Sequence, residues 1–162
     1  MNVLDTLFEQ HSFRLGVSRG EYFFHRFPHL PSQLMEFLVS LLPAIFFALG
    51  ILHAVMGALV MITGTHFLTQ LQTLSPVINP LYLMMNGMLA ISNGLFMLLA
   101  FTEIKRQTEN GWRTFFLINL VSILQSILSI VFTPRAIFSV ILYIAITMYL
   151  TFEFKPYFKK VI

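Results

Sequence analysis

The stretch LYLMMNGMLAISNGLFMLLAF, residues 81–101, decides the fold of this chain. It contains no charged residue, and roughly 20 apolar residues suffice for a helix that crosses the hydrocarbon layer of a bilayer. The dipeptide Asn-Gly, which often marks a tight turn, occurs in it at 86–87 and again at 93–94. Two turns so close together would leave no room for a strand between them, and their flanks are almost wholly apolar. We therefore predict one membrane helix in which the spacing of seven residues matters more than the dipeptide.

The composition of the whole chain agrees with a membrane protein. Of its 162 residues, 57% are hydrophobic and 10% are charged, whereas a soluble domain is about 25% charged. Three further apolar segments are long enough to span a bilayer, at about 37–62, 114–132 and 136–152. We predict an all-α integral membrane protein with four transmembrane helices in an antiparallel bundle. The transmembrane domain, 34–154, lies between an N-terminal cytoplasmic or interfacial segment, 1–33, and a basic cytoplasmic tail, 155–162.

The distribution of Lys and Arg predicts the orientation. Nine of the ten basic residues precede the first span, follow the last or lie between spans two and three, and only Arg135 lies on the other side. By the positive-inside rule, both termini face the cytoplasm. The first thirty residues lack the unbroken apolar run of a signal peptide, so the first span is expected to act as an uncleaved signal. The location that we predict is a bacterial inner membrane or an equivalent energy-transducing or organellar membrane.

The connecting segments carry three local predictions. In the charged loop between spans two and three, Asn110-Gly111 is expected to form the turn. In the opposite loop, apolar residues over 67–74 have the spacing of a short amphipathic helix on the membrane surface. Near the N-terminus a helical stripe predicts a further amphipathic segment, which either rests on lipid headgroups or docks to a partner subunit. That stripe consists of Val3, Leu4, Leu7, Phe8, His11 and Leu15.

Polar and small residues fall on one face of each predicted span, because positions seven apart nearly coincide on a helix. The second span aligns Asn79, Asn86 and Asn93, beside a glycine pair, Gly87 and Gly94. The other spans carry Gly50 and Gly57, then Asn119, Ser122, Ser126 and Ser129 with Gln125 at the edge, and finally Ser139, Tyr143 and Thr147. Lipid cannot satisfy an Asn amide, so these faces should meet protein. They either pack helix against helix or line a polar path for a solute.

His53 is the one titratable residue in the middle of a predicted span. Gly50 and Gly57, one turn to either side, would leave space for a flat macrocycle, so His53 could serve as the single axial ligand of haem or a chlorophyll-type pigment. The simpler interpretation is a histidine that hydrogen-bonds the polar face of a neighbouring helix. The chain has no cysteine and one aspartate, and the sequence offers no catalytic constellation, metal motif or nucleic-acid motif.

Three functional hypotheses follow from these patterns. The first is a non-catalytic accessory or structural subunit of a larger membrane complex. Such a subunit would be surrounded by membrane lipids and would pack against other membrane subunits through its small and polar helix faces. The second is a small homo-oligomeric transporter or channel with an Asn/Ser-lined path. The third is a pigment- or haem-binding membrane subunit that uses His53. Neither an enzymatic activity nor nucleic-acid binding is expected.

Overall fold

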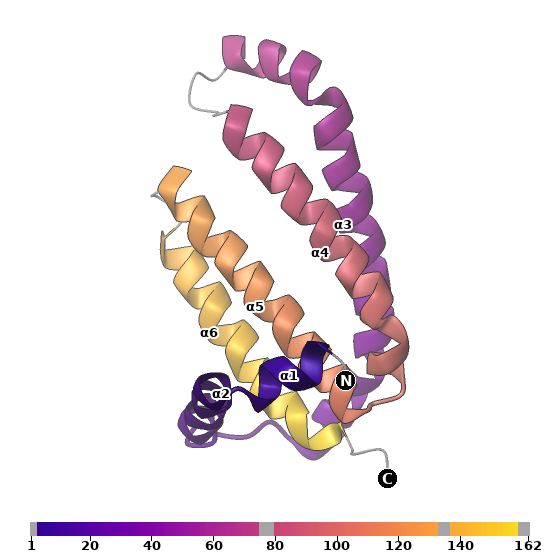
Figure 1. Cartoon of the computed structure of the whole chain (residues 1–162), viewed down its shortest axis with the longest axis vertical. Coiled ribbons are helices and arrows are strands. Elements are labelled where there is room, and N and C mark those ends of the chain that lie inside the picture. The colour runs from indigo at the N-terminus through magenta and orange to yellow at the C-terminus, as the bar shows by residue number, and fades with distance from the viewer. Residues whose placement is uncertain (1–2, 75–79, 133–136, 159–162) are drawn as a thin grey trace.

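The chain is nearly all helical (Figure 1). The computed structural model describes residues 3–74, 80–132 and 137–158, and the side chains of 6–62, 84–130 and 137–158. Its helices are α1 (Val3–Glu9), α2 (His11–Phe24), α3 (Ser32–Leu74), α4 (Pro80–Lys105), α5 (Glu109–Phe132) and α6 (Ile137–Phe154), and a 3-10 turn, Lys155–Tyr157, follows α6. Within these described ranges, four helices are long and apolar enough to cross a membrane. The prediction of four helices with the length and composition of membrane spans is therefore confirmed.

The spans extend beyond the predicted boundaries at their charged ends. Helix α3 begins at Ser32, five residues before the predicted start, and α4 continues to Lys105. At the other end, α3 continues to Leu74 as one helix of 43 residues, so residues 67–74 are helical as predicted but form the end of α3 and not a helix of their own. The flanking residues 32–36 and 102–105 include no proline or glycine, so the helical hydrogen-bond ladder continues through them. Asn79 and the predicted tight connection at 133–135 lie outside the described residues.

Helices α3 and α4 pack backbone to backbone along the glycines. A methyl group added at Gly57 would lie 2.6 Å from the carbonyl oxygen of Gly87, and one added at Gly94 would lie 2.6 Å from that of Gly50. The contacting pairs run in opposite order along the two helices. Since small residues let membrane helices approach closely, we call these four glycines the glycine seam.

The connection between α4 and α5 is built around Thr108 and not around Asn110-Gly111. The Thr108 hydroxyl oxygen accepts a hydrogen bond from the Gly111 N–H at 3.0 Å, as an N-cap does, and α5 begins at Glu109. Gly111 packs directly against the Glu103 carbonyl, and a methyl group there would overlap it. The predicted turn at Asn110-Gly111 is therefore wrong, because a helix cap at Thr108 places both residues inside the first turn of α5. The chain reverses instead at Gln107, which has a φ of 52°.

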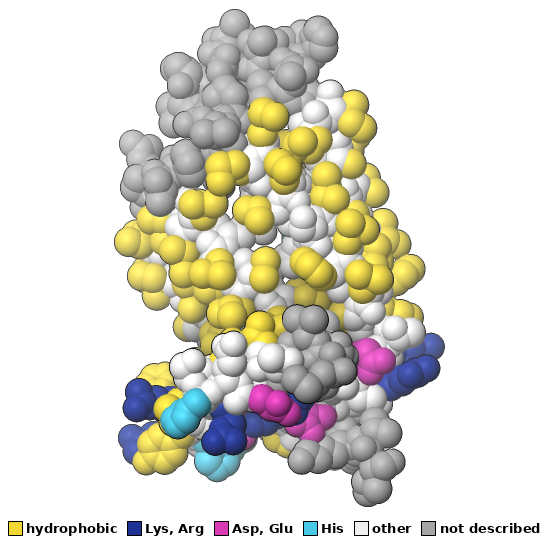
Figure 2. Space-filling model, viewed as in Figure 1, with side chains coloured by type: hydrophobic (Ala, Val, Ile, Leu, Met, Phe, Trp, Pro, Cys, Tyr) yellow, Lys and Arg dark blue, Asp and Glu magenta, His cyan; other side chains and the backbone are white. Residues whose placement is uncertain are grey.

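Helices α1 and α2 lie at the same end of the molecule as the 3-10 turn that follows α6 (Figure 1). Charged side chains and histidines gather at this end, and hydrophobic side chains cover the described length of the spans (Figure 2). The chain bends at Gln10, so the predicted N-terminal stripe does not form one continuous helix. Phe8 and Phe13 pack edge-on against Phe116 of α5, whereas Leu15 is exposed. The bend changes the helical register, which explains why residues beyond it depart from the stripe.

Three polar contacts fasten the segment between α2 and α3 to α6. The Glu153 carboxylate lies 3.0 Å from Nδ1 of His29 and accepts a hydrogen bond from the Leu30 N–H at 3.2 Å. The Tyr149 hydroxyl donates to the Pro28 carbonyl at 2.7 Å. Together with the aromatic contacts of α1, they hold the charged end of the molecule together while the spans diverge from it (Figure 1).

Candidate functional site

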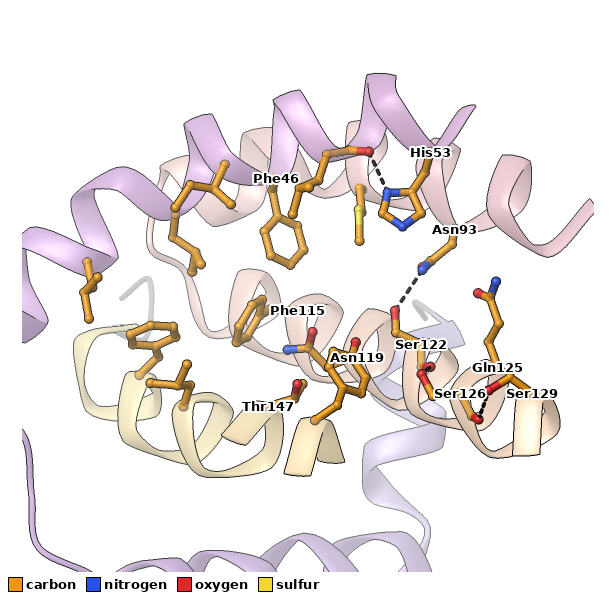
Figure 3. Close-up of a pocket in the computed structure, with 18 of the residues that line it drawn as sticks. Phe46, His53, Asn93, Phe115, Asn119, Ser122, Gln125, Ser126, Ser129 and Thr147 are labelled. Atoms are coloured by element: carbon orange, nitrogen blue, oxygen red, sulfur yellow. Dashed lines mark hydrogen bonds between the residues drawn. The ribbon is translucent and has the colours of Figure 1, made fainter. Parts of the chain in front are cut away.

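A cavity of about 610 Å³ lies between the four spans. All four helices contribute to its walls, and Figure 3 shows side chains of α3 facing those of α5 and α6 across it. Helices α3 and α6 line it without extended packing against each other in the described residues, so the open side of the cavity lies between them. Its polar lining consists of His53, Asn86, Asn93, Asn119, Ser122, Gln125, Ser126, Ser129, Tyr143 and Thr147.

Two amide hydrogen bonds join α4 to α5 along the cavity wall. Nδ2 of Asn93 donates to the hydroxyl oxygen of Ser122 at 2.8 Å (Figure 3). About two turns away, Nε2 of Gln125 donates to Oδ1 of Asn86 at 2.5 Å. Because Asn86 and Asn93 are seven residues apart on α4, both can reach the same face of α5. The Asn face of α4 thus contacts protein on one side and the cavity on the other.

A third amide joins α5 to α6. Nδ2 of Asn119 donates to the Thr151 hydroxyl oxygen at 2.9 Å, and that hydroxyl donates in turn to the Thr147 carbonyl at 2.6 Å. The carbonyl of Thr151 accepts a hydrogen bond from the indole N–H of Trp112 at 2.9 Å. Thr151 is completely buried, and the sequence analysis missed it. Its position four residues after Thr147, and eight after Tyr143, is the signal that extends the polar stripe of this helix.

His53 projects from α3 into the cavity with one nitrogen engaged. Its Nδ1 lies 2.8 Å from the Leu49 carbonyl oxygen. Because a carbonyl can only accept, Nδ1 must carry the proton, and in the neutral imidazole Nε2 is then an acceptor. Figure 3 shows that second nitrogen on the cavity side of the ring. The sequence predicted a bond to a neighbouring helix, whereas the bond in the structure is to Leu49 of the histidine's own helix.

The glycines beside His53 do not provide open space for a macrocycle. Gly50 and Gly57 belong to the glycine seam, and the space next to them is filled by α4. A haem or chlorophyll-type pigment bound to His53 would have to occupy the cavity instead. The axial-ligand hypothesis stays a prediction, and a visible absorption spectrum of the purified protein tests it.

Three aromatic rings line the cavity toward the charged end of the molecule. The ring of Phe46 on α3 lies 5.1 Å from that of Phe115 on α5, which lies 5.8 Å from that of Phe154 on α6. All three are buried and line the cavity. We call this row the aromatic floor. It gives the cavity an apolar end, opposite the amides, serines and His53 (Figure 3).

One polar atom of the wall has no partner. Asn93 is 2% exposed, and its Oδ1 accepts no hydrogen bond in the part of the chain that the structure describes. The Ser122 hydroxyl proton is donated to the Ile118 carbonyl at 2.9 Å, so the group facing Ser122 must be the amide N–H₂ of Asn93. An unsatisfied buried acceptor costs about 1–3 kcal/mol, so the protein keeps it at the expense of stability.

The structure separates the predicted site residues into two groups. Asn86, Asn93, Asn119 and the serines of α5 line the cavity together with His53, Tyr143 and Thr147. The four glycines line the contact between α3 and α4. Ser139 is exposed and is not among the lining residues.

The chain matches no protein-family model, no curated protein and no solved structure. Among its described residues, no group of three or more His, Asp or Glu could hold a metal ion. The cavity therefore has to be interpreted from its own chemistry.

Proposed function

We propose that this protein binds a small solute in the cavity between its four spans and carries it across the membrane. The observation that supports the proposal is the polar wall of a cavity of about 610 Å³, with the buried and unpartnered Oδ1 of Asn93 in it. Ligand cavities in membrane helical bundles are the usual reason for polar groups at this depth, since hydrocarbon cannot satisfy them. A polar face that served packing alone would close against its neighbour.

The aromatic floor favours a carrier over an open channel. Phe46, Phe115 and Phe154 lie between the polar wall and the charged end. Apolar rings at this end of the cavity disfavour the entry of water and ions. Transport then requires the two helix pairs, α3 with α4 and α5 with α6, to move relative to each other at the floor.

Transport by reconstituted protein tests the proposal. Proteoliposomes would be given a panel of radiolabelled polyols, amines and amino acids, and uptake would be compared with that of empty liposomes. Replacing Asn86 and Asn93 together with leucine should abolish uptake of whichever solute the wild type moves. The matched control is Ser92→Leu, which changes an exposed position of the same helix outside the cavity. Equal uptake by the wild type and the double variant would contradict the proposed path.

The finer topology forms part of the same proposal. We propose an antiparallel bundle with both termini in the cytoplasm and with α1 and α2 at the membrane interface. Nine of ten basic residues on one side of the four spans support it. Because the chain has no cysteine, single cysteines report topology without background. Ser18→Cys should react with an impermeant maleimide only after the inner face is opened, and Ser75→Cys should react in intact cells. The reverse pattern would contradict the orientation.

We also propose, as the second candidate function, that the protein is an accessory subunit of a larger membrane complex. Its support is the aromatic surface of the α2 end, where Tyr22 is 66% exposed and Phe23 is 56% exposed. Such a surface suits either the headgroup region or a partner subunit. Purification in a mild detergent distinguishes them: a monodisperse 18.6 kDa species with no co-purifying protein would count against a subunit role.

A further inference from the structure

The hydroxyl protons on the α5 wall of the cavity are already engaged. Ser122, Ser126 and Ser129 donate to backbone carbonyls of their own helix, at 2.9, 2.9 and 2.6 Å respectively. A serine hydroxyl has one proton and two acceptor lone pairs. What these serines present to the cavity is therefore oxygen that can accept a hydrogen bond.

Three of the four amides of the wall have the same polarity, whereas Asn86 accepts through its Oδ1 and keeps its amide N–H₂ as a donor. Asn93, Asn119 and Gln125 each direct the amide nitrogen at a protein oxygen, on Ser122, Thr151 and Asn86 respectively. The carbonyl oxygen of Asn93 is fully buried and accepts no hydrogen bond in the described part of the chain. Nε2 of His53 adds another acceptor, since Nδ1 carries the proton. The wall is therefore rich in acceptors.

The lining contains no carboxylate, lysine or arginine among the described residues. A carboxylate or phosphate head would meet no cation there and would face oxygens that repel it. A head that donates hydrogen bonds would instead satisfy several of these acceptors together. At the opposite end, Leu38, Leu42 and the aromatic floor offer an apolar surface for the remainder of the molecule.

From this arrangement we propose that the cavity selects an amphiphile whose head donates hydrogen bonds, an alcohol or a protonated amine on an apolar body. Such a molecule reaches the cavity from the bilayer through the open side between α3 and α6. The head lies against the acceptors of α4, α5 and His53, and the body lies on the aromatic floor. This inference rests on the proposed function, because it specifies the ligand of the same cavity.

Photolabelling of the full-length protein in nanodiscs tests the ligand class. The probe is a fatty alcohol with a diazirine in its chain, and labelled peptides are located by mass spectrometry. Labels are expected near the aromatic floor, on the peptides that contain Phe46 and Phe115. Decanol and decylamine should compete with the probe, whereas decyl methyl ether, decanoate and decyltrimethylammonium should not. The ether lacks only the donor proton of the alcohol, and the trimethylammonium has the charge of the amine without its N–H groups.

Two variants remove single acceptors. His53→Phe keeps a ring but loses Nε2, and since His53 bonds only its own helix in the described structure, the fold should tolerate it. Asn93→Leu removes the orphaned oxygen. Each should weaken competition by decanol about tenfold, the effect of one lost hydrogen bond. Ser92→Leu, on the exposed side of α4, should leave competition unchanged.

The outcomes separate the two proposals. Competition by the methyl ether or by decanoate as strong as that by decanol would overturn the selection of donors and leave ligand binding in the cavity intact. Equal competition by trimethylammonium and amine would also overturn it, since charge alone would then be recognised. No labelling of cavity peptides by the probe would overturn both the selection and the proposed binding cavity.

Discussion

The two faces of α4 carry out opposite tasks with residues that are adjacent in the sequence. Gly87 and Gly94 let α3 approach until backbone touches backbone. Asn86 and Asn93, one residue earlier in each case, hold α5 by single hydrogen bonds and leave a cavity beside it. Close packing of small residues gains dispersion energy at many atoms, whereas one amide bond gains little in a membrane. The glycine seam therefore fixes one helix pair, and the amide wall permits the two pairs to diverge.

The largest effect on stability is expected from a methyl group added in the glycine seam. Gly94→Ala places it 2.6 Å from both the Ala54 nitrogen and the Gly50 carbonyl oxygen, so α3 and α4 must separate. We expect a loss of about 2 kcal/mol in the free energy of unfolding, despite the better helix propensity of alanine. Reversible unfolding in mixed micelles with dodecyl sulfate measures it. Gly16→Ala is the control, because a methyl group there contacts nothing within 4 Å and should not destabilise. Equal stability of the two variants would contradict the seam.

A smaller effect is expected on the amide wall. Gln125→Leu removes the hydrogen bond to Asn86 and leaves that oxygen half-exposed at the cavity. Interhelical hydrogen bonds in membranes average about 0.6 kcal/mol, so the loss should be of that size. The same unfolding assay, with Ser92→Leu as the control on the exposed side, decides it. A loss as large as that of Gly94→Ala would show that the wall fixes the helices as firmly as the seam.

Gly87→Ala tests how local the seam is. Its methyl group would lie 3.1 Å from a side-chain carbon of Val60 and 3.3 Å from the Gly57 carbonyl oxygen. The Val60 side chain can shift, and alanine favours the helix by up to about 1 kcal/mol. We expect a net change within about 0.5 kcal/mol. Stability and helical content by circular dichroism check this, and a collapse like that of Gly94→Ala would mean that the seam tolerates no methyl group anywhere.

Asn93→Leu should leave the free energy of unfolding unchanged or raise it slightly, so it is the least destabilising variant of the series. It removes an unpartnered buried oxygen, and Ser122 keeps its bond to the Ile118 carbonyl, so no polar group is orphaned. If ligand binding in the cavity falls while unfolding is unaffected, Asn93 serves the ligand and not the fold. A clear loss of stability would instead assign Asn93 to packing.

Several features of the fold could be predicted from the sequence because their causes are local. Four long apolar runs predict four spans, since a bilayer requires about 20 apolar residues in each. The spacing of seven between Asn86 and Asn93 places them on one face of a helix whatever surrounds it. The structure shows both lining the cavity.

The remaining features depend on competition between distant groups. Asn110-Gly111 favours a turn by itself, but the Thr108 cap and the contact of Gly111 with the Glu103 carbonyl place it within a helix. The cavity could not be predicted from periodicity, because the same spacing of polar residues occurs on helix faces that pack closely and on faces that line a cavity. Which of the two forms depends on how the helices cross, and the contacts among Phe46, Phe115 and Phe154 reflect the crossing of three of them.

The aromatic floor also has an electrical consequence. If the polar cavity were continuous with water at the charged end, most of the transmembrane voltage would fall across the part of the protein that water does not reach. Since each elementary charge moved through 100 mV involves about 2.3 kcal/mol, even a brief continuous file of water would discharge the ion gradients of the cell. The rings of Phe46, Phe115 and Phe154 make the end of the cavity nearest the charged residues apolar, which disfavours such a continuous file of water.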